Sequence, residues 1–341
     1  IPMRTLRRQT RYALEGVDDI LVYKVAMTTR FRGVTRREGL LLHGHVGWGE
    51  AAPFWNYDDL ESSRWLAAAL ESARCFPPVP RRKFVPVNVT IPVISPEEAY
   101  ERVKASGGCS TAKIKVAEPG VSVGRDCARI AAVAEALRET VGGQAMIRLD
   151  ANGAWEVDQA REAIPAMASA AGVVPIEYVE QPCPTVDELA QVRRSADVPI
   201  AADESIRRAE DPLEVARKEA ADVVIIKVAP LGGVRAALKV ARKSGLGVVV
   251  SSALETSVGL SVGVAAAAAV PGVPRAAGLA TASLLVGDVT QPLIPERGRL
   301  PVGRLEPDQE LIDRTPVDGD LVSRWGMRLE GMAEHLRVGS R

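Results

Sequence analysis

Six charged residues recur along the chain at spacings that could bring them into one site. They are Lys113 and Lys115, two residues apart in TAKIKVA, then Asp150, Glu180, Asp203 and Lys227, separated by 30, 23 and 24 residues. Lysines and carboxylates in one pocket can move protons and bind a cation. The three histidines (His43, His45 and His335) lie near the ends of the chain. Acid–base chemistry in the middle of the chain therefore depends on Lys, Asp, Glu or Tyr.

The segments around these residues predict the elements that must position them. From about residue 84, short β-branched runs such as AMIRLDANG and DVVIIKVAP alternate seven times with helix-like stretches. This alternation predicts a parallel sheet with right-handed crossovers, and eight such strands close into a barrel. After the eighth, less clear strand (RAAGLATAS) no helix is expected. We therefore predict an α/β fold, a (β/α)7β modified TIM barrel, over residues 84–290.

The two ends of the chain predict a second unit. Residues 1–83 contain KVAMTTRF, GLLLHGHVGWGE and DDLESSRWLAAALESARCF, which indicate a small antiparallel sheet followed by helices. We expect an α+β capping domain there, and we expect residues 291–341, rich in proline and charge, to pack back on it. Gly47 and Gly49 of GWGE either shape a loop that closes over the site or serve as turn residues.

In such a barrel the chemistry gathers at the carboxyl ends of the strands. Six consecutive predicted strands, from the second to the seventh, place a polar residue at this level, and the seventh contributes Ser251 and Ser252. Asp150, Glu180 and Asp203 come from three adjacent strands, where unpaired carboxylates would repel one another. A divalent cation resolves this repulsion, and an all-oxygen ligand set favours Mg²⁺ over zinc. Alternatively, each carboxylate caps a helix or pairs with an arginine.

The lysines predict a two-sided site. In a strand, Lys113 and Lys115 project from the same face, and the strand that carries Lys227 lies roughly opposite. We expect the fixed charge of Lys113 to lower the pKa of Lys115 toward ~7–8, which suits a general base. Lys115 could then remove the α-proton of a Mg²⁺-bound carboxylate, and Lys227 would stabilise the enediolate. Alternatively, each lysine pairs with a neighbouring carboxylate.

The overall composition excludes some classes of partner. Lys+Arg and Asp+Glu are equal at 43 each, so no net charge points to nucleic acid or to a membrane surface. The four cysteines form no CxxC pair, and IPMRTLRRQT does not resemble a signal peptide. We expect a cytoplasmic protein that acts on a small carboxylate as a monomer or small homo-oligomer.

These motifs resemble those of the enolase superfamily. TAKIKVA, RLDANGAW, VEQP, AADES and IIKVAPLGG are similar to its muconate-lactonizing-enzyme subgroup, over most of the chain. The resemblance implies a capping domain on a (β/α)7β barrel, with Lys115 and Lys227 as the catalytic pair. It also implies Mg²⁺, with Mn²⁺ able to substitute, on Asp150, Glu180 and Asp203. Substrate-binding roles would fall to Asn152, Ser251 and Ser252.

Within the subgroup, GWGEAAPFW, VVVSSALETSVGL and GLATASLLVGD most resemble the o-succinylbenzoate synthases. This resemblance implies dehydration of 2-succinyl-6-hydroxy-2,4-cyclohexadiene-1-carboxylate in menaquinone biosynthesis. The alternatives are N-acylamino acid racemase, dipeptide epimerase and, more weakly, muconate cycloisomerase. Dipeptide epimerases typically carry DxD at the eighth strand, whereas this chain has no acid there before Asp288. A non-catalytic metal- or carboxylate-binding barrel would not need lysines on both sides of the site.

Overall fold

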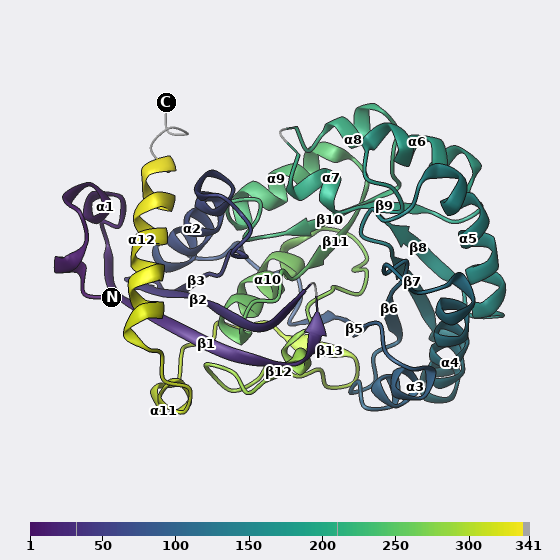
Figure 1. Cartoon of the computed structure of the whole chain (residues 1–341), viewed down its shortest axis with the longest axis horizontal. Coiled ribbons are helices and arrows are strands. Elements are labelled where there is room, and N and C mark those ends of the chain that lie inside the picture. The colour runs from purple at the N-terminus through teal and green to yellow at the C-terminus, as the bar shows by residue number, and fades with distance from the viewer. Residues whose placement is uncertain (32, 210, 337–341) are drawn as a thin grey trace.

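The computed structural model describes residues 1–31, 33–209 and 211–336. The chain forms two packed parts, a strand–helix barrel and a smaller cap of antiparallel strands and helices (Figure 1). Each part has its own cluster of buried apolar side chains. The sequence-based boundaries at residues 83 and 290 remain a proposal.

Seven parallel strands form the barrel sheet, in the order β11-β10-β9-β8-β7-β6-β5. They are β5 (Asn88–Ile91), β6 (Thr111–Lys115), β7 (Met146–Asp150), β8 (Ile176–Glu180), β9 (Ile200–Ala202), β10 (Val223–Lys227) and β11 (Gly247–Ser251). All five residues of β10 are buried, as expected for a parallel strand covered on both faces. The parallel sheet that the strand–helix alternation predicted is confirmed.

Two residues, Ala277 and Gly278, close the sheet into a barrel. Asn88 N donates to Ala277 O at 3.0 Å on one side, and Gly278 N donates to Val250 O at 2.8 Å on the other. A Cβ on Gly278 would lie 2.5 Å from Ser251 Oγ and 3.1 Å from Ser251 Cβ, so glycine permits this approach without a shift of Ser251. The predicted eighth strand is thus present as a pair of parallel bridges between β11 and the start of β5.

Helices cover the outside of the barrel. They are α3 (Pro96–Lys104), α4 (Val123–Val141), α5 (Val157–Ala171), α6 (Val186–Ser195), α7 (Glu204–Arg207), α8 (Glu214–Arg217), α9 (Val234–Ser244) and α10 (Ser257–Ala269). Capping boxes begin α3, with Ser95 and Glu98, and α6, with Thr185 and Glu188. The strongly apolar helix α10 is buried along most of its length. Among the described residues no helix is long and apolar enough to cross a membrane.

Two segments of the alternation depart from its regular pattern in the structure. The helix-like stretch DPLEVARKEA contains only the four-residue α8, and Glu219 behind it has a positive φ of 50°. The β-branched run FVPVNVTIP is divided into β4 (Phe84–Pro86) and β5. β4 leaves the barrel sheet and pairs antiparallel with β13 (Arg299–Pro301).

The cap is a four-stranded antiparallel sheet in the order β12-β1-β2-β3, covered by helices. Its elements are α1 (Arg8–Ala13), β1 (Val17–Phe31), β2 (Val34–Gly44), β3 (Gly47–Ala51), α2 (Asp59–Arg74), β12 (Leu285–Val286), α11 (Gln309–Asp313) and α12 (Gly319–His335). Short 3-10 turns occupy η1 (Met3–Thr5), η2 (Gly142–Gln144) and η3 (Ala282–Leu284). The chain therefore returns to the cap sheet at residue 285, directly after the barrel closes.

The C-terminal helix α12 lies against α2 on the cap (Figure 1). Its buried Arg328 donates to Phe54 O at 2.7 Å, Tyr57 O at 3.0 Å and Ser62 Oγ at 2.8 Å. Trp325 and Leu329 of α12 are fully buried in the cap core. This packing agrees with the expected return of the C-terminal segment; its residues 337–341 lie outside the described part of the chain.

Candidate active site

Three buried carboxylates stand at the carboxyl ends of adjacent barrel strands. Asp150 ends β7 and Glu180 ends β8, and the two are paired in register. Asp203 directly follows β9, whose residue Ala201 pairs with Glu180. Each of the three side chains is at most 1% exposed. The structure therefore brings together the three carboxylates that the strand spacing singled out.

Three lysines form ion pairs with these carboxylates. Lys113 Nζ lies 2.9 Å from Asp150 Oδ2 and 2.9 Å from Glu180 Oε1. Lys115 Nζ donates to Asp150 Oδ2 at 2.5 Å, and Lys227 Nζ donates to Asp203 Oδ2 at 2.6 Å. Such charges can stay buried because each has an oppositely charged partner. The alternative considered for the sequence, lysine–carboxylate pairing, is thus the arrangement found in the structure.

Burial and pairing shift the pKa values of these groups in different directions. Burial opposes the charge on Lys113, but Asp150 and Glu180 raise its pKa well above the ordinary value. Burial also opposes ionisation of Asp150, yet Lys113 and Lys115 hold the pKa of Asp150 well below its usual range. Burial, followed by the charge of Asp150, raises the pKa of Glu180 to about 7. The two carboxylate partners of Lys113 therefore favour its charged form. The sequence argument about Lys115 left out Asp150, which pairs with both lysines.

Lys115 and Lys227 face one small cavity from different strands. This cavity, of about 30 Å³, is lined by Lys113, Lys115, Lys227, Ser251, Ser252 and other residues at the barrel mouth. Such a volume holds about two water molecules. Ser252 Oγ lies 2.9 Å from Thr281 Oγ1, and Ser251 Oγ donates to Gly278 O at 3.4 Å. The two serines named from the sequence therefore border the space between the lysines.

Asn152 lies beside Lys115, where the cap meets the mouth of the barrel. Its Oδ1 accepts from Lys115 Nζ at 2.7 Å, and its Nδ2 donates to Glu204 Oε1 at 3.2 Å. Asn152 lines two cavities between the cap and the barrel, one of about 670 Å³ beside Thr29 and Arg30 and one of about 600 Å³ beside Trp55 and Tyr57. Residues of the cap thus form part of the approach to Lys115.

Arg207 was not singled out from the sequence, although it touches the site. Its Nε donates to Asp203 Oδ1 at 3.2 Å, its Nη2 donates to Glu204 Oε1 at 2.8 Å, and its Nη1 donates to Tyr57 Oη at 3.0 Å. It therefore links a candidate metal ligand to the cap. The only signal in the sequence is its position four residues after Asp203, a spacing that places both on one side of a helical turn.

A second missed pair holds the backbone around Lys115. Arg129 Nη2 donates to Lys115 O at 2.8 Å, and Asp126 Oδ2 accepts from Ala117 N at 2.9 Å. Arg129 and Asp126 also form an ion pair with each other. Ala117 has a positive φ of 64°, a conformation that is costly unless the surroundings hold it. The pair fixes the end of β6 directly after the lysine.

The donor set fits a hard divalent cation. Three carboxylates on adjacent strands supply only oxygen ligands, which suits Mg²⁺, and their burial explains why they need positive partners. As placed, however, no three His, Cys, Asp or Glu side chains among the described residues converge closely enough to hold a metal ion. Lysines pair with Asp150 and Asp203 instead. The three carboxylates therefore have the chemistry of a magnesium site, although two of them form ion pairs with lysines in this structure.

The glycines of GWGE do not form a loop over the site. Both belong to strand β3, which pairs with β2. A Cβ on Gly49 would lie 2.0 Å from Ala69 O of α2, so Gly49 allows the helix to pack on the strand. Gly47 opens the strand with a φ of 142°. Of the two roles considered for these glycines, the closing loop is not the one found, because both positions lie in a strand inside the cap.

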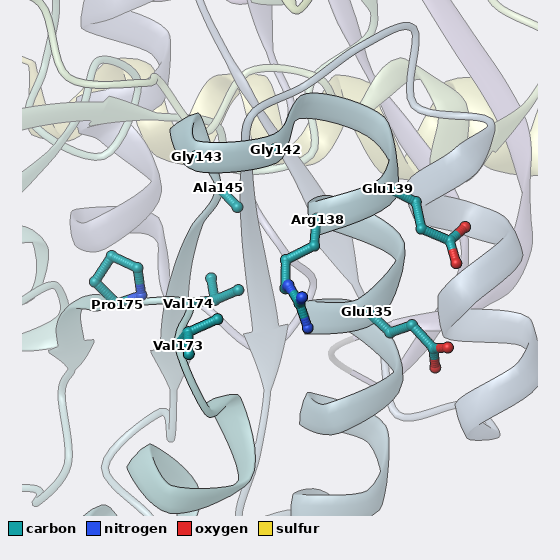
Figure 2. Close-up of a pocket in the computed structure, with 9 residues that line it drawn as sticks. All are labelled: Glu135, Arg138, Glu139, Gly142, Gly143, Ala145, Val173, Val174 and Pro175. Atoms are coloured by element: carbon teal, nitrogen blue, oxygen red, sulfur yellow. The ribbon is translucent and has the colours of Figure 1, made fainter.

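A separate cavity lies away from these residues. It has a volume of about 570 Å³ and is lined at the end of α4 and before β7 and β8 by Glu135, Arg138, Glu139, Gly142, Gly143, Ala145, Val173, Val174 and Pro175 (Figure 2). In Figure 2 the carboxylates of Glu135 and Glu139 point away from Val173 and Pro175. The cavity lies at the amino ends of the strands, opposite the lysines, and contains none of the candidate site residues.

Comparison with known proteins gives consistent results. The family model described as "Enolase C-terminal domain-like" matches residues 96–308, and "Enolase N-terminal domain-like" matches residues 22–73. The chain is 53% identical over 308 residues to an o-succinylbenzoate synthase of Thermobifida fusca, covering 90% of this chain and 93% of that protein. It is 48% identical over 292 residues to an o-succinylbenzoate synthase of Mycobacterium tuberculosis, covering 86% of each.

Solved structures show the same architecture. The L-Ala-D/L-Glu epimerase from Bacillus subtilis superposes with a TM-score of 0.70 at 25% identity, over 85% of this chain and 96% of that one. Muconate cycloisomerase from Pseudomonas fluorescens gives a TM-score of 0.70 at 20% identity, over 89% and 99% of the two chains, which indicates a shared fold.

Proposed function

Because this chain belongs to the enolase superfamily and, within it, to the o-succinylbenzoate synthase family, we propose specific roles for its residues in the reaction of that family. The enzyme is a lyase that dehydrates 2-succinyl-6-hydroxy-2,4-cyclohexadiene-1-carboxylate to 2-succinylbenzoate, a step of menaquinone biosynthesis. Enzymes of this superfamily generally use Mg²⁺.

One observation carries the proposal for the catalytic pair. Lys115 and Lys227, on strands four positions apart in the sheet, line the same cavity together with Ser251 and Ser252. A substrate carboxylate in this space would have an ammonium group on either side. Lys115 is the base in this scheme, because it also faces the entrance cavity beside Asn152. Lys227 is the fixed cation in this scheme, because Asp203 Oδ2 at 2.6 Å keeps the buried ammonium group charged.

The reaction then proceeds in two proton transfers by one residue. Neutral Lys115 Nζ takes the proton from the ring carbon that bears the carboxylate, and the C–H electrons pass into the carboxylate as an enediolate. Lys227 stabilises that charge. The enediolate electrons then return to the ring and expel the hydroxyl group, which takes the proton from Lys115 and leaves as water. The ring becomes aromatic, and Lys115 is neutral again.

Asp150, Glu180 and Asp203 would hold the metal ion. When bound, the cation supplies positive charge beside the substrate carboxylate, which acidifies the α-proton. Mn²⁺ offers the same charge with similar oxygen ligands, so we propose that it substitutes for Mg²⁺. Lys113 contacts Asp150 and Glu180, and its positive charge would offset part of the negative charge of these two carboxylates.

Substrate contacts are proposed for three further residues. Asn152, Ser251 and Ser252 border the spaces on the two sides of Lys115, and their side chains can donate to substrate oxygens. The four cysteines are unpaired in the structure. The cytoplasmic location and the oligomeric state remain predictions.

Turnover of the purified protein tests the proposal. The cyclohexadiene substrate should lose its absorbance when enzyme and Mg²⁺ are added, and EDTA should stop the loss. N-acylamino acids should be offered in parallel, because racemisation is the alternative activity for the same lysine pair. Fast racemisation without dehydration would favour the alternative.

A further inference from the structure

Arg37, on strand β2 of the cap, is a buried cation whose hydrogen bonds go to backbone carbonyls. It is 3% exposed. Its Nε donates to Leu254 O at 2.9 Å, and its Nη2 donates to Ala52 O. The guanidinium lies over the ring of Phe54, 4.3 Å from the centroid. Burying a guanidinium is costly, and the charge of the buried Glu255 beside the turn offsets part of that cost. The hydrogen bonds to two backbone carbonyls point to a positional role.

The two acceptors of Arg37 belong to different walls of the site. Leu254 follows β11 and lines the small cavity that contains Lys115 and Lys227. Ala52 and Phe54 lead into the cap segment 55–57, which lines the entrance cavity beside Asn152. One planar group thus joins a barrel turn to a cap segment, which are about 200 residues apart in the sequence.

The barrel turn requires such support. Leu254 has a positive φ of 65°, which is unfavourable for a leucine and persists only where the surroundings hold it. Besides Arg37, Ser252 Oγ accepts from Leu254 N at 3.5 Å, and Glu255 Oε2 accepts from Ala253 N at 2.7 Å. These two contacts are local to the turn. Among the described hydrogen bonds of the turn's backbone, Arg37 supplies the one that comes from the cap.

We propose that Arg37 is a positioning residue that sets the affinity for substrate by fixing the turn at residues 252–254 against the cap. The inference rests on the proposed function, since it takes the space beside this turn as the substrate site. Without the guanidinium, the carbonyl of Leu254 loses its charged donor and the turn relaxes away from Lys115 and Lys227. Substrate and product then bind less tightly, while the lysine chemistry itself remains.

Three variants test this inference. Arg37→Met keeps the length of the side chain and removes the charge, and Arg37→Lys keeps the charge but loses the planar fork. Arg82→Met is the matched control. Arg82 also donates to backbone carbonyls, those of Ala267, Val270 and Gly272, but at the opposite end of α10. Its loss should lower thermal stability without changing the substrate site.

The measurements are KM and kcat with the cyclohexadiene substrate, the Kd of 2-succinylbenzoate with Mg²⁺ by calorimetry, and the melting temperature. For Arg37→Met we expect KM and product Kd to rise about tenfold, as for the loss of one hydrogen bond to a charged group, with kcat changed less than about threefold. Arg37→Lys should fall between this variant and the wild type. Should Arg37→Met fail to fold, Arg37→Lys carries the test.

A merely structural role would lower the melting temperature and the active fraction, and so kcat, but leave KM and Kd unchanged. That result for the Arg37 variants, or an equal rise in KM for Arg82→Met, would overturn the inference. Failure of the proposed function looks different: the wild type itself would neither turn over the substrate nor bind the product.

Discussion

Lys227 Nζ and Asp203 Oδ2, from neighbouring strands of the barrel, are 2.6 Å apart, and Lys115 Nζ makes the matching contact to Asp150 on the other side. Each proposed catalytic lysine is thus paired with a proposed metal ligand. A cation that binds these carboxylates would take over part of the role of the lysines, which links metal binding to the state of the catalytic pair.

The first prediction concerns the metal ligands. Asp150→Asn, Glu180→Gln and Asp203→Asn each delete one negative charge from the proposed magnesium site. Each should weaken Mg²⁺ binding and lower kcat by about a hundredfold or more. Calorimetric titration with Mg²⁺ measures the first effect without depending on turnover, and the cyclohexadiene assay measures the second.

Asp222→Asn is the control for these three variants. Asp222 is a half-exposed carboxylate paired with Arg193 at 2.8 Å, and it precedes β10 at the opposite end of the barrel. Its variant should bind Mg²⁺ and turn over substrate as the wild type does. Near-normal activity without extra Mg²⁺ in two of the three ligand variants would contradict the metal assignment.

The second prediction separates the two lysines. Lys115→Ala should abolish turnover, because no other group takes the α-proton, and small amines should partly restore it. Lys227→Arg keeps a positive charge and should retain more activity than Lys227→Ala. Losing a preorganised charge in a dry site typically costs about 3–4 kcal/mol, or roughly a hundred- to a thousandfold in rate. If Lys115→Ala turned over faster than Lys227→Ala at saturating Mg²⁺, the two roles would be reversed.

A third prediction concerns dipeptides with a free amino terminus. Gly278 and Thr281 line the cavity between the lysines and carry no charge. The next acid, Asp288, instead accepts hydrogen bonds from Ser257 N and Ser257 Oγ. A substrate ammonium would therefore find no carboxylate at the eighth strand. An Ala–Glu dipeptide should be epimerised poorly, and efficient epimerisation in a chiral assay would promote the alternative function.

The fourth prediction concerns Glu50, which joins the cap to the start of α10. Its carboxylate accepts from Tyr23 Oη at 2.6 Å, Thr256 N at 3.0 Å and Gly259 N at 3.0 Å. Burial nevertheless raises the pKa of Glu50 from 4.5 to about 7. The folded protein therefore holds this proton more tightly than the unfolded chain between these pH values. Its contribution to the free energy of unfolding should decrease by about 3 kcal/mol as the pH rises through this window.

Denaturant unfolding at pH 5 and pH 8 measures this effect. The change in the free energy of unfolding between the two pH values should be compared for the wild type and Glu50→Gln. Other titrating groups, Glu180 among them, cancel in the comparison because both proteins contain them. The variant should lose less stability on going to pH 8. Equal changes in the two proteins would show that Glu50 does not titrate in this range.

The sequence correctly predicted that the polar residues lie at the carboxyl ends of the barrel strands, because each strand–helix unit has a nearly constant length. Asp150, Glu180 and Lys227 end their strands as the spacing required. The α/β barrel followed from the same periodicity. These features are local, or repeat locally, so one sequence contains enough information to place them.

Contacts across the two parts of the molecule could not be predicted in this way. Arg37 and Leu254 are 217 residues apart, and Thr256 and Glu50 are 206 apart. Nothing in the periodicity of either segment marks the other as its partner. The pairing of Lys115 with Asp150 was open for a different reason: a lysine beside a carboxylate can form an ion pair or act on a ligand, and residue types do not decide between them.

The cap sheet has a consequence for how the protein is made. Strand β12 supplies its edge, through Leu285 and Val286 paired with Met27 and Ala26, and α12 covers α2. During synthesis, the first strands leave the ribosome long before these partners exist. At roughly 5–20 residues per second the wait is on the order of 10–50 s. Through that interval the nascent chain presents one unpaired edge of β1 and the apolar face of α2 that α12 later covers.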